Sequence, residues 1–359
     1  MPGDGPAVLD SMVVEGHESV MFAVDRASGL KAIIAIHSTA LGPALGGTRF
    51  FPYADEAAAI TDVLRLSEGM TFKAAAAGLN LGGGKAVIMG DPDELGTEAL
   101  LEAYGRAVDR LGGAYVTAED VGTTVEMMAV VARQTSHVKG LPRESGGSGD
   151  PSPMTARGVH VSMQAVANTL WGTPSLAGRT VAIQGVGKVG ARLAERLAAD
   201  DVRLLISDVD TEALETVAAS TGAEIVEPPS LLEAECDILA PCALGAVLSA
   251  DTIPRLRCAA VVGSANNQLA EDEDADRLAA RGILYAPDYV VNAGGIVNIG
   301  VEVETGTYAE ELAGERVDQI ADRLTEILQE ADRRGVTPSA AAEQLARQRI
   351  ASGSTARPS

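Results

Sequence analysis

The chain has 359 residues, and typical domain sizes make two domains the expectation for that length. With 46% hydrophobic and 22% charged residues, it has the composition of a folded globular protein and not of a disordered or fibrous one. The formal net charge of -22 argues against nucleic acid or an anionic membrane as a partner, because phosphate groups bind basic surfaces.

The first part of the chain alternates strand-like and helical patterns. Residues 19–24 and 30–37 are rich in Val, Ile and Ala and flank a turn-forming segment, which predicts a β-hairpin. Apolar residues recur at helical spacing from 55 to 77, which predicts a helix with Lys73 near its C-terminal end. The remaining elements predicted here are a strand at 86–89 after three glycines, a helix at about 96–111 and a strand at 114–117. This alternation predicts an α/β domain.

A stretch of turn-forming residues, 144–153, separates the two halves of the chain. A helix is predicted after it at about 154–170, followed by a strand, glycine turn, helix and strand over 180–208. The fold class is therefore α/β with two domains. We expect a first domain of residues 1–150, a second of residues 151–305, and C-terminal helices over 306–350 that pack back towards the first domain.

A glycine motif joins a predicted strand to a predicted helix in the second domain, and its sequence is Gly185-Val186-Gly187-Lys188-Val189-Gly190. Glycines there permit a tight turn, a close approach of backbone to pyrophosphate and packing of helix on strand, and the helix N-terminus presents N–H groups to the anion. Asp208 ends the next predicted strand, near the spacing expected of the acid that binds the ribose hydroxyls. Asp210 would repel a 2′-phosphate, so the motif favours NAD over NADP. A plain turn before a helix is the alternative.

Two lysines and an aspartate are candidates for chemistry in the first domain. Lys73 and Lys85 flank an uncharged segment. In a shared, partly desolvated pocket, burial and mutual repulsion favour the neutral form, so one lysine could act as a base while the other binds a carboxylate. Asp120 lies just beyond a predicted strand end, where α/β domains present functional side chains. The alternatives are two solvated lysines and an aspartate that caps a helix starting near Thr123.

Other chemistries find no support in the sequence. The four histidines lack the spacing of metal ligands, so no metal is expected. No G-x-S-x-G motif of a serine hydrolase is present. A 2-hydroxy-acid dehydrogenase would use a histidine as its acid–base group, and no histidine here lies in a comparable motif.

The N-terminus and the cysteines predict a cytoplasmic protein. Residues 1–10 lack the basic and apolar regions of a secretory signal, and no apolar run approaches the roughly 20 residues of a membrane span. Cys236, Cys242 and Cys258 are odd in number and have no C-x-x-C spacing, so we expect reduced, buried thiols.

Several motifs follow one another in order along nearly the whole chain. In the first domain they are Leu41–Arg49, Gly69–Lys73, Gly82–Ala86 and Thr117–Gly122. In the second they are Asp150–Thr155, Gly185–Gly190, Ala240–Gly245, Ser264–Gln268 and Tyr285–Gly295. Together they resemble the glutamate/leucine/phenylalanine/valine dehydrogenase family, and within it the enzymes that act on valine or leucine.

This resemblance implies an NAD-dependent L-amino-acid dehydrogenase. The substrate amino acid, NAD⁺ and water would give a 2-oxo acid, ammonium and NADH, and the reverse reaction would be a reductive amination. The resemblance implies that Lys73 binds the substrate carboxylate, that Lys85 activates the attacking water and that Asp120 exchanges protons with the amino group. The first domain would also carry the oligomerisation surface, and a homo-oligomer is expected.

The resemblance assigns further residues to the substrate and the cofactor. Gly46 and Gly47 would approach the substrate through their backbone. Thr155 and Asn267 would lie near the nicotinamide, Asp208 would lie at the adenosine ribose, and the glycine motif with Lys188 and Val189 would contact the dinucleotide.

Four pocket positions favour a branched aliphatic side chain in the substrate. Leu45 and Ala118 are similar to the residues of leucine and valine enzymes, whereas phenylalanine enzymes tend to have smaller residues there. Ile296 and Ile299 stand where leucine enzymes often have Val, and an extra methylene shortens the pocket, which favours valine slightly. Val301 lacks the carboxylate that is usual at its position. The alternatives are a phenylalanine-type enzyme and a non-catalytic NAD-binding regulator.

Overall fold

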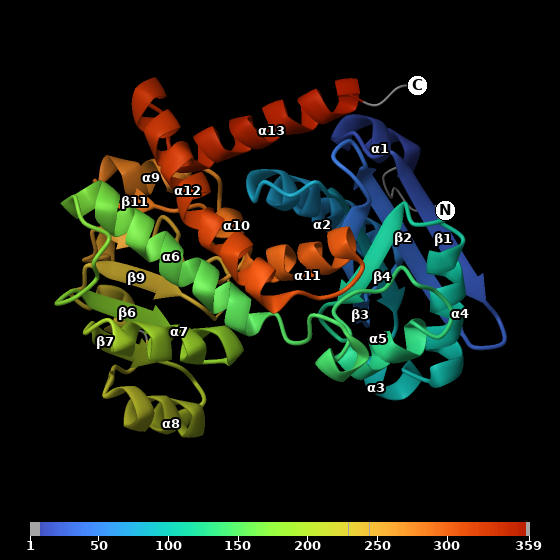
Figure 1. Ribbon diagram of the computed structural model, residues 1–359, viewed down its shortest axis with the longest axis horizontal. Helices are drawn as coiled ribbons and strands as arrows, with labels where there is room; N and C mark the ends of the chain where they lie inside the picture. Colours follow the sequence, from blue (N-terminus) through green and yellow to red (C-terminus); the bar gives the residue numbers. More distant parts are fainter. Residues whose placement is uncertain (1–7, 229, 244, 357–359) are drawn as a thin grey trace. The chain divides into compact units, whose positions relative to one another are not determined.

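The computed structural model of the protein describes residues 8–228, 230–243 and 245–356. Residues 1–7, which belong to the stretch that lacks a secretory signal, lie outside the described residues. The chain divides into two units (Figure 1). The first comprises Met1–Asp150, Ile299–Ala309 and Ala346–Ser359, and the second comprises Pro151–Asn298 and Glu310–Leu345.

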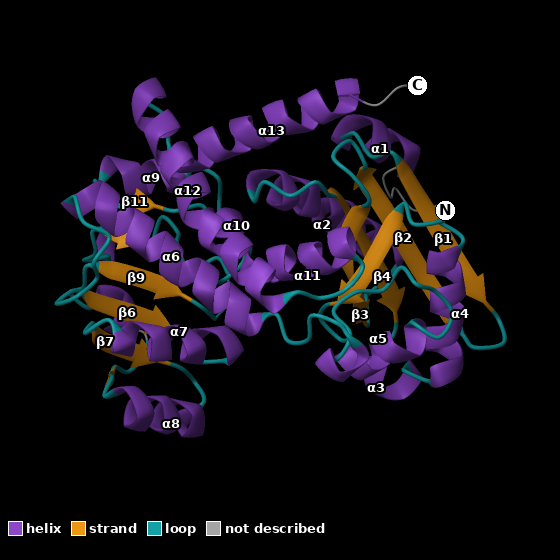
Figure 2. Ribbon diagram, viewed as in Figure 1, coloured by secondary structure: helices purple, strands orange, loops and turns teal. Residues whose placement is uncertain are grey.

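A mixed sheet of five strands forms the centre of the first unit (Figure 2). The strands are β1 (Ser19–Asp25), β2 (Leu30–Ser38), β3 (Ala44–Phe51), β4 (Gly82–Met89) and β5 (Tyr115–Glu119). Their order is β1-β2-β4-β3-β5; β1 and β2 form the predicted antiparallel hairpin, β2 is antiparallel to β4, and β3 is parallel to both β4 and β5. The helices of this unit are α1 (Val8–Glu15), α2 (Glu56–Ala76), α3 (Pro92–Leu95), α4 (Glu98–Asp109) and α5 (Val125–Val131), with a 3-10 turn η1 (Arg143–Ser145).

Side chains of successive strand residues point to opposite faces of this sheet, and each face has its own helices. One face carries Ile33, Ala35 and Val87, which pack with Val63 and Leu64 of α2. The other face packs against α4 and α5 through a larger set of buried residues, among them Ile34, Ile88, Tyr104 and Met128. Lys85 and Val87 are two residues apart on β4, so Lys85 lies on the face that α2 covers.

Local signals in the sequence explain where these helices begin. The carboxylate of Asp55 accepts a hydrogen bond from the N–H of Ala58 and caps α2, which confirms the helix predicted from 55 to 77. The helix predicted at 96–111 is confirmed as α4, which Thr97 caps, and the short helix α3 before it was not predicted. Glycines 82–84 are part of β4, which begins earlier than predicted.

A parallel sheet of six strands forms the centre of the second unit. The strands are β6 (Thr180–Gln184), β7 (Arg203–Ser207), β8 (Glu224–Ile225), β9 (Ile238–Pro241), β10 (Ala260–Val261) and β11 (Leu284–Tyr285). Their order, β11-β10-β9-β6-β7-β8, has the first strand of the unit beside the fourth, which is the doubly wound arrangement that binds dinucleotides. The helices are α6 (Ser152–Trp171), α7 (Lys188–Ala199), α8 (Thr211–Thr221), α9 (Asp274–Ala280) and α10 (Asp288–Val291), with 3-10 turns η2 (Ser230–Glu233) and η3 (Ile253–Arg255). The helix α11 (Gly294–Thr305) begins in this unit, and its residues from Ile299 onward belong to the first unit.

The C-terminal helices are α12 (Glu310–Arg334) and α13 (Pro338–Ala356), and they are arranged differently from the prediction. We expected residues 306–350 to pack towards the first domain. Instead α12 packs on α6 of the second unit, because its apolar stripe is buried there and Arg157 pairs with Asp318 through two contacts of 2.6 Å. Only the last part of α13, from Ala346, belongs to the first unit.

Candidate active site

The strand pleat places several predicted site residues on one face of the first sheet. Leu45 and Gly47 lie on β3 and alternate in direction with Gly46. Gly47 is the register partner of Ala118 on β5, and Leu45 is the partner of Gly83 on β4. Lys85, two residues after Gly83, therefore shares this face. The face is the one that α2 covers, since a Cβ at Gly83 would lie 2.1 Å from the backbone N of Thr71.

Lys85 and Asp120 form an ion pair on this face. Lys85 Nζ lies 2.8 Å from Asp120 Oδ2, and the lysine side chain is only 6% exposed. Burial lowers the pKa of Lys85, and the Asp120 carboxylate offsets part of that shift. Burial also opposes ionisation of Asp120, but Lys85 and Arg49 outweigh it and hold the pKa of that carboxyl below its ordinary value. The pair is therefore a buried lysine with a weakened hold on its proton beside an ionised carboxylate.

Asp120 does not cap the following helix. Thr124 accepts from the N–H of Met127 and caps α5. The backbone N–H of Asp120 donates to Thr123 Oγ1 at 2.9 Å, and this turn directs the Asp120 carboxylate back over the sheet. The alternative that Asp120 is a helix cap is wrong, because a threonine nearer to the helix takes that role.

Glycines leave room between Lys85 and Asp120. A Cβ at Gly47 would lie 2.7 Å from Asp120 Cβ and 2.6 Å from the carbonyl oxygen of Glu119. A Cβ at Gly46 would lie 1.7 Å from the carbonyl oxygen of Gly84, so no side chain fits at either position. The buried Tyr115 hydroxyl donates to the Gly46 carbonyl at 2.7 Å and fixes this part of β3.

A second layer of charges, which the sequence reasoning missed as a site, surrounds Asp120. Arg49 Nε donates to Asp120 Oδ2 at 3.2 Å, and the same guanidinium donates through NH1 to Asp62 Oδ2 at 2.8 Å. Asp62 also accepts from the Tyr53 hydroxyl at 2.7 Å and from Arg65 at 3.0 Å. Asp62 lies on α2 and Arg49 on β3, so the network joins the helix to the sheet beside the lysine.

Lys73 lies in the last turn of α2, on the helix that covers this face. It is partly buried. The C-terminal end of the helix is fixed by Arg349 of α13, whose guanidinium donates to the carbonyls of Ala75 at 3.1 Å and Gly78 at 2.8 Å and to Asn80 Oδ1 at 3.0 Å. These contacts join the last part of α13 to the C-terminal end of α2 and the turn that follows it.

The four predicted pocket residues are apolar; Leu45, Ala118 and Ile296 are buried, and Ile299 is partly buried. Leu45 and Ala118 are buried on the face with Lys85. Ile299 belongs to the first unit, where its Cδ1 would lie 4.0 Å from a Cβ at Gly140. Ile296 is buried in the second unit. Because α11 contains both isoleucines three residues apart, they lie on the same side of that helix.

Glu302 lies on α11 directly after Val301, the residue that lacks the carboxylate usual at its position. Its buried carboxylate accepts hydrogen bonds from the backbone N–H groups of Gly140 at 3.1 Å and Ser148 at 3.0 Å, and Lys139 lies 3.8 Å away. Val301 is fully buried. Glu302 thus orders the segment around Ser148, which is part of the stretch of turn-forming residues 144–153.

The glycine motif of the second unit has the geometry of a dinucleotide loop. Gly185 has φ +98°, and a Cβ at Gly190 would lie 1.9 Å from the Gly185 carbonyl, so both positions require glycine. Gly187 is exposed with no atom within 4 Å of a Cβ position, and it precedes α7 without a side-chain cap. Lys188 is exposed and Val189 partly buried at the start of α7. The open helix N-terminus fits a pyrophosphate.

The other predicted cofactor residues are Asp208, Thr155 and Asn267. Asp208 follows β7, and its Oδ2 accepts from the Val186 N–H at 2.6 Å, which ties it to the glycine loop. Thr155 lies in the first turn of α6 and donates to the carbonyl of Pro151 at 3.0 Å. Asn267 is exposed and has φ 51°, a left-handed conformation that asparagine tolerates. The three residues belong to one unit, and Asp208 is adjacent to the loop.

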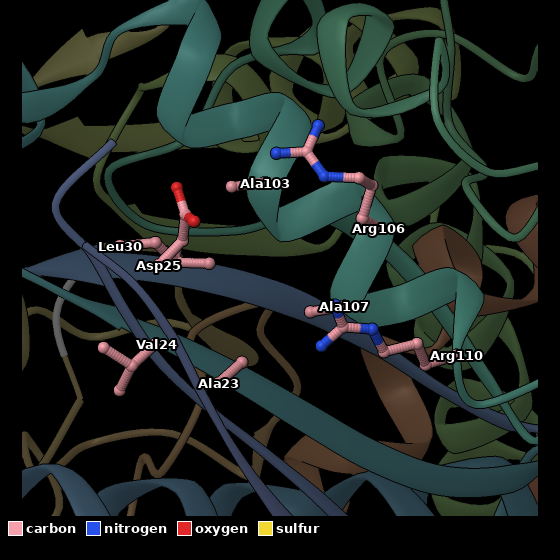
Figure 3. Close-up of a pocket in the computed structure, with 8 residues that line it drawn as sticks. All are labelled: Ala23, Val24, Asp25, Leu30, Ala103, Arg106, Ala107 and Arg110. Carbon is pink, nitrogen blue, oxygen red and sulfur yellow. The ribbon is translucent and has the colours of Figure 1, made fainter. Parts of the chain in front are cut away.

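A small cavity lies elsewhere in the first unit, between the β1–β2 hairpin and α4 (Figure 3). Its volume is about 50 Å³, enough for a few water molecules but well below the roughly 300 Å³ and more of a ligand pocket. Its polar side chains are Asp25, Arg106 and Arg110, and no predicted site residue lines it.

Among the described residues, no group of three or more His, Cys, Asp or Glu side chains is placed to hold a metal ion. None of the helices in the described part of the chain is long and apolar enough to cross a membrane.

The chain is similar to known dehydrogenases over most of its length. Residues 15–137 match "Glu/Leu/Phe/Val dehydrogenase, dimerisation domain", and residues 146–211 and 201–357 match "Glutamate/Leucine/Phenylalanine/Valine dehydrogenase". The chain is 49% identical over 336 residues to the leucine dehydrogenase of Bacillus cereus, which covers 94% of this chain and 91% of that one. It is 50% identical over 339 residues to the valine dehydrogenase of Streptomyces coelicolor, with 94% and 93% covered. The crystal structure of L-tryptophan dehydrogenase from Nostoc punctiforme superimposes with a TM-score of 0.86 at 42% identity, covering 97% of this chain and 100% of that one.

Proposed function

The chain belongs to the Glu/Leu/Phe/Val dehydrogenase family, whose members use a nicotinamide cofactor, and we propose that it oxidatively deaminates valine or leucine with NAD as the cofactor. The reverse reaction is the reductive amination of the branched 2-oxo acid. One observation carries this proposal: the buried Lys85 ammonium lies 2.8 Å from Asp120 on a sheet face that also presents Leu45 and Ala118. An acid–base pair is thus placed beside small aliphatic walls.

The two charged groups of an amino acid have separate partners in this proposal. Lys73 binds the substrate carboxylate and stays protonated. Lys85, whose pKa burial lowers, is the base that takes a proton from the water attacking the imino carbon. Asp120 exchanges protons with the amino nitrogen, accepting one as the imine forms and returning one as ammonia leaves. Gly46 and Gly47 admit the substrate because neither position can hold a side chain.

The second unit supplies the cofactor site in this proposal, with NAD as the preferred cofactor. NAD, when bound, provides the nicotinamide ring that accepts a hydride from the substrate α-carbon. The glycine loop and the first turn of α7, including Lys188 and Val189, hold the pyrophosphate, and Asp208 accepts from the adenosine ribose hydroxyls. Asp210 caps α8 beside it, so a 2′-phosphate would meet two carboxylates. Thr155 and Asn267 are assigned to the nicotinamide end.

We place substrate binding, catalysis and subunit contacts in residues 1–150. The matched family description names this region a dimerisation domain, and β1 is an edge strand with exposed Phe22 and Val24. These features support a homo-oligomer, which light scattering on the purified protein would measure.

The three cysteines are free thiols, and burial raises the pKa of Cys236 to about 12 and of Cys258 to about 11. Unreactive thiols suit the proposed cytoplasmic location.

The side chain of the substrate is set by four residues in this proposal. We assign Leu45, Ala118, Ile296 and Ile299 to the substrate side chain; all four are aliphatic, and none of them offers a cation to the second carboxylate of glutamate. An aromatic substrate is the second candidate, because the superimposed structure is named a tryptophan dehydrogenase. Ala118 favours the branched aliphatic substrate over the aromatic one, since its methyl group leaves less room for a ring than glycine would.

The test follows NADH absorbance after L-valine, L-leucine, L-phenylalanine, L-tryptophan or L-glutamate is added to the purified protein with NAD⁺. We expect NADH and equimolar ammonium from valine and leucine. A faster rate with the aromatic amino acids would support the second candidate. Silence with all five would contradict the proposal and favour a non-catalytic NAD-binding regulator.

A further inference from the structure

We propose that Arg49 is a positioning residue that supplies a permanent counter-charge to Asp120, so that Asp120 remains ionised when Lys85 gives up its proton. This inference rests on the proposed function, because it assigns the partner that lets the lysine and the aspartate act separately. The reaction requires Lys85 to be neutral while Asp120 is ionised. If the two groups paired only with each other, the Asp120 carboxylate would favour the protonated form of Lys85 and oppose that state.

The geometry around Asp120 Oδ2 is the first observation. Lys85 Nζ at 2.8 Å and Arg49 Nε at 3.2 Å approach the same oxygen. When Lys85 is neutral, Arg49 is the cation that still contacts the carboxylate. A carboxylate this buried would otherwise lose its charge or hold the lysine proton. Both cations contact Oδ2, so we assign the proton exchange with the amino nitrogen to Oδ1.

The second observation is that Arg49 is held in place. Its side chain is 23% exposed, and its NH1 donates to Asp62 at 2.8 Å. Asp62 is in turn held by Tyr53 at 2.7 Å and Arg65 at 3.0 Å. The guanidinium therefore bridges the carboxylates of Asp120 and Asp62 through two different nitrogens, a geometry that one ammonium group could not reproduce.

The charges facing Lys85 can be followed element by element. From β3 comes Arg49, from the residue after β5 comes Asp120, and from α2 comes Asp62. Arg49 lowers the pKa of Lys85, whereas Asp120 and Asp62 raise it. The removal of Arg49 should therefore strengthen the hold of Lys85 on its proton, and the removal of the Asp62 charge should weaken it.

The sequence makes a direct measurement practical. The chain has five lysines, at positions 31, 73, 85, 139 and 188. Protein labelled with ¹³C at the lysine ε-carbons gives five NMR signals, and a Lys85→Arg variant identifies that of Lys85. The chemical shift followed from pH 6 to pH 11 reports the titration of Lys85 with or without turnover.

In Arg49→Gln we expect the Lys85 titration to move to higher pH by roughly one to two units. The acid limb of the pH profile of kcat/KM for valine should move with it, because deamination needs neutral Lys85. Arg65→Gln is the matched control: it removes one positive charge from the same network but contacts only Asp62, so little shift is expected. Arg49→Lys keeps the positive charge but cannot bridge both carboxylates, so it should restore only part of the pH profile.

Asp62→Asn keeps the proposal falsifiable if Arg49→Gln fails to fold. It should move the Lys85 titration to lower pH, the opposite direction. An unchanged Lys85 titration in Arg49→Gln, or a shift in Arg65→Gln as large as in Arg49→Gln, would overturn the proposal even if turnover fell. An inactive wild-type protein would contradict the proposed function, whereas the NMR titration would still decide the role of Arg49.

Discussion

Lys85 Nζ lies 2.8 Å from Asp120 Oδ2, although Lys85 is on β4, Asp120 follows β5, and β3 lies between these two strands. The distance is short because Gly47 lies between them on the intervening strand and has no side chain. The first prediction concerns this pair. In Lys85→Met, kcat for deamination should fall by about 10²–10⁴, since the base is lost while Lys73 still binds the carboxylate. Steady-state kinetics with valine would measure kcat and KM separately.

Lys31→Ala is the control for the loss of a lysine from the same sheet, because Lys31 is exposed on β2. It should leave kcat and the melting temperature unchanged. Normal turnover in Lys85→Met would show that another group activates the water.

Substitution by alanine should affect cofactor binding at Gly187 but stability at Gly190. At Gly187 a Cβ would meet no atom within 4 Å, so Gly187→Ala should fold with an unchanged Tm but raise KM for NAD⁺ severalfold by crowding the pyrophosphate. At Gly190 a Cβ would lie 1.9 Å from the Gly185 carbonyl, so Gly190→Ala should lower Tm. Calorimetry and NAD⁺ kinetics measure the two effects. Equal stability of both variants would contradict this account of the loop.

Much of this loop could be predicted from the sequence, because strand, glycines and helix are consecutive and their geometry is local. Lys85 and Asp120 could also be named as candidates, because they stand beside glycines and after a strand end, but their ion pair was not predicted because it depends on the strand order β4-β3-β5. Arg49 was overlooked because its role depends on Asp62 and Asp120, and Asp120 is 71 residues away along the chain. The position of α12 was missed because an amphipathic pattern shows that a face is buried but not which element buries it.

A pair of buried histidines should make stability depend on pH. The rings of His17 and His37 meet edge to face at 4.8 Å; His17 Nε2 lies 2.9 Å from Ser67 Oγ and His37 Nδ1 lies 2.8 Å from Thr71 Oγ1. Burial lowers the pKa of both histidines, and His37 lowers that of His17 further. The unfolded chain therefore binds protons that the folded chain does not as the pH falls below about 6.5, so stability should fall in that direction.

The urea midpoint at pH 5.5 should lie below that at pH 7.5, and the difference should shrink in a His17→Gln/His37→Gln double variant. His137→Gln serves as the matched control. A difference that the double variant leaves unchanged would assign the effect to other groups.

Glu302 provides a prediction about the segment that runs from Gly140 to Ser148. Glu302→Gln should lower the free energy of unfolding by about 1–3 kcal/mol. If the glutamine oxygen accepts from both Gly140 and Ser148, its NH₂ group must face the Lys139 ammonium, which is also a donor. The segment before Gly140 is joined to β5, because the backbone of Thr117 is hydrogen-bonded to the backbone of His137 and Lys139. Thr117 precedes Ala118, so a disturbed segment should also raise KM for valine. Urea unfolding and kinetics check both effects, with Glu304→Gln on the exposed side of α11 as control. A more stable Glu302→Gln variant would contradict this role.

The reverse reaction tests the central claim most directly. The purified protein, NADH and ammonium are mixed with the 2-oxo acid of valine, leucine, phenylalanine or glutamate, and kcat/KM is obtained from the loss of NADH absorbance. We expect the branched 2-oxo acids to give the highest kcat/KM and the 2-oxo acid of glutamate to give none, since the proposed pocket offers no cation for a second carboxylate. Preference for the 2-oxo acid of glutamate, or no NADH consumption with any of the four, would contradict the account.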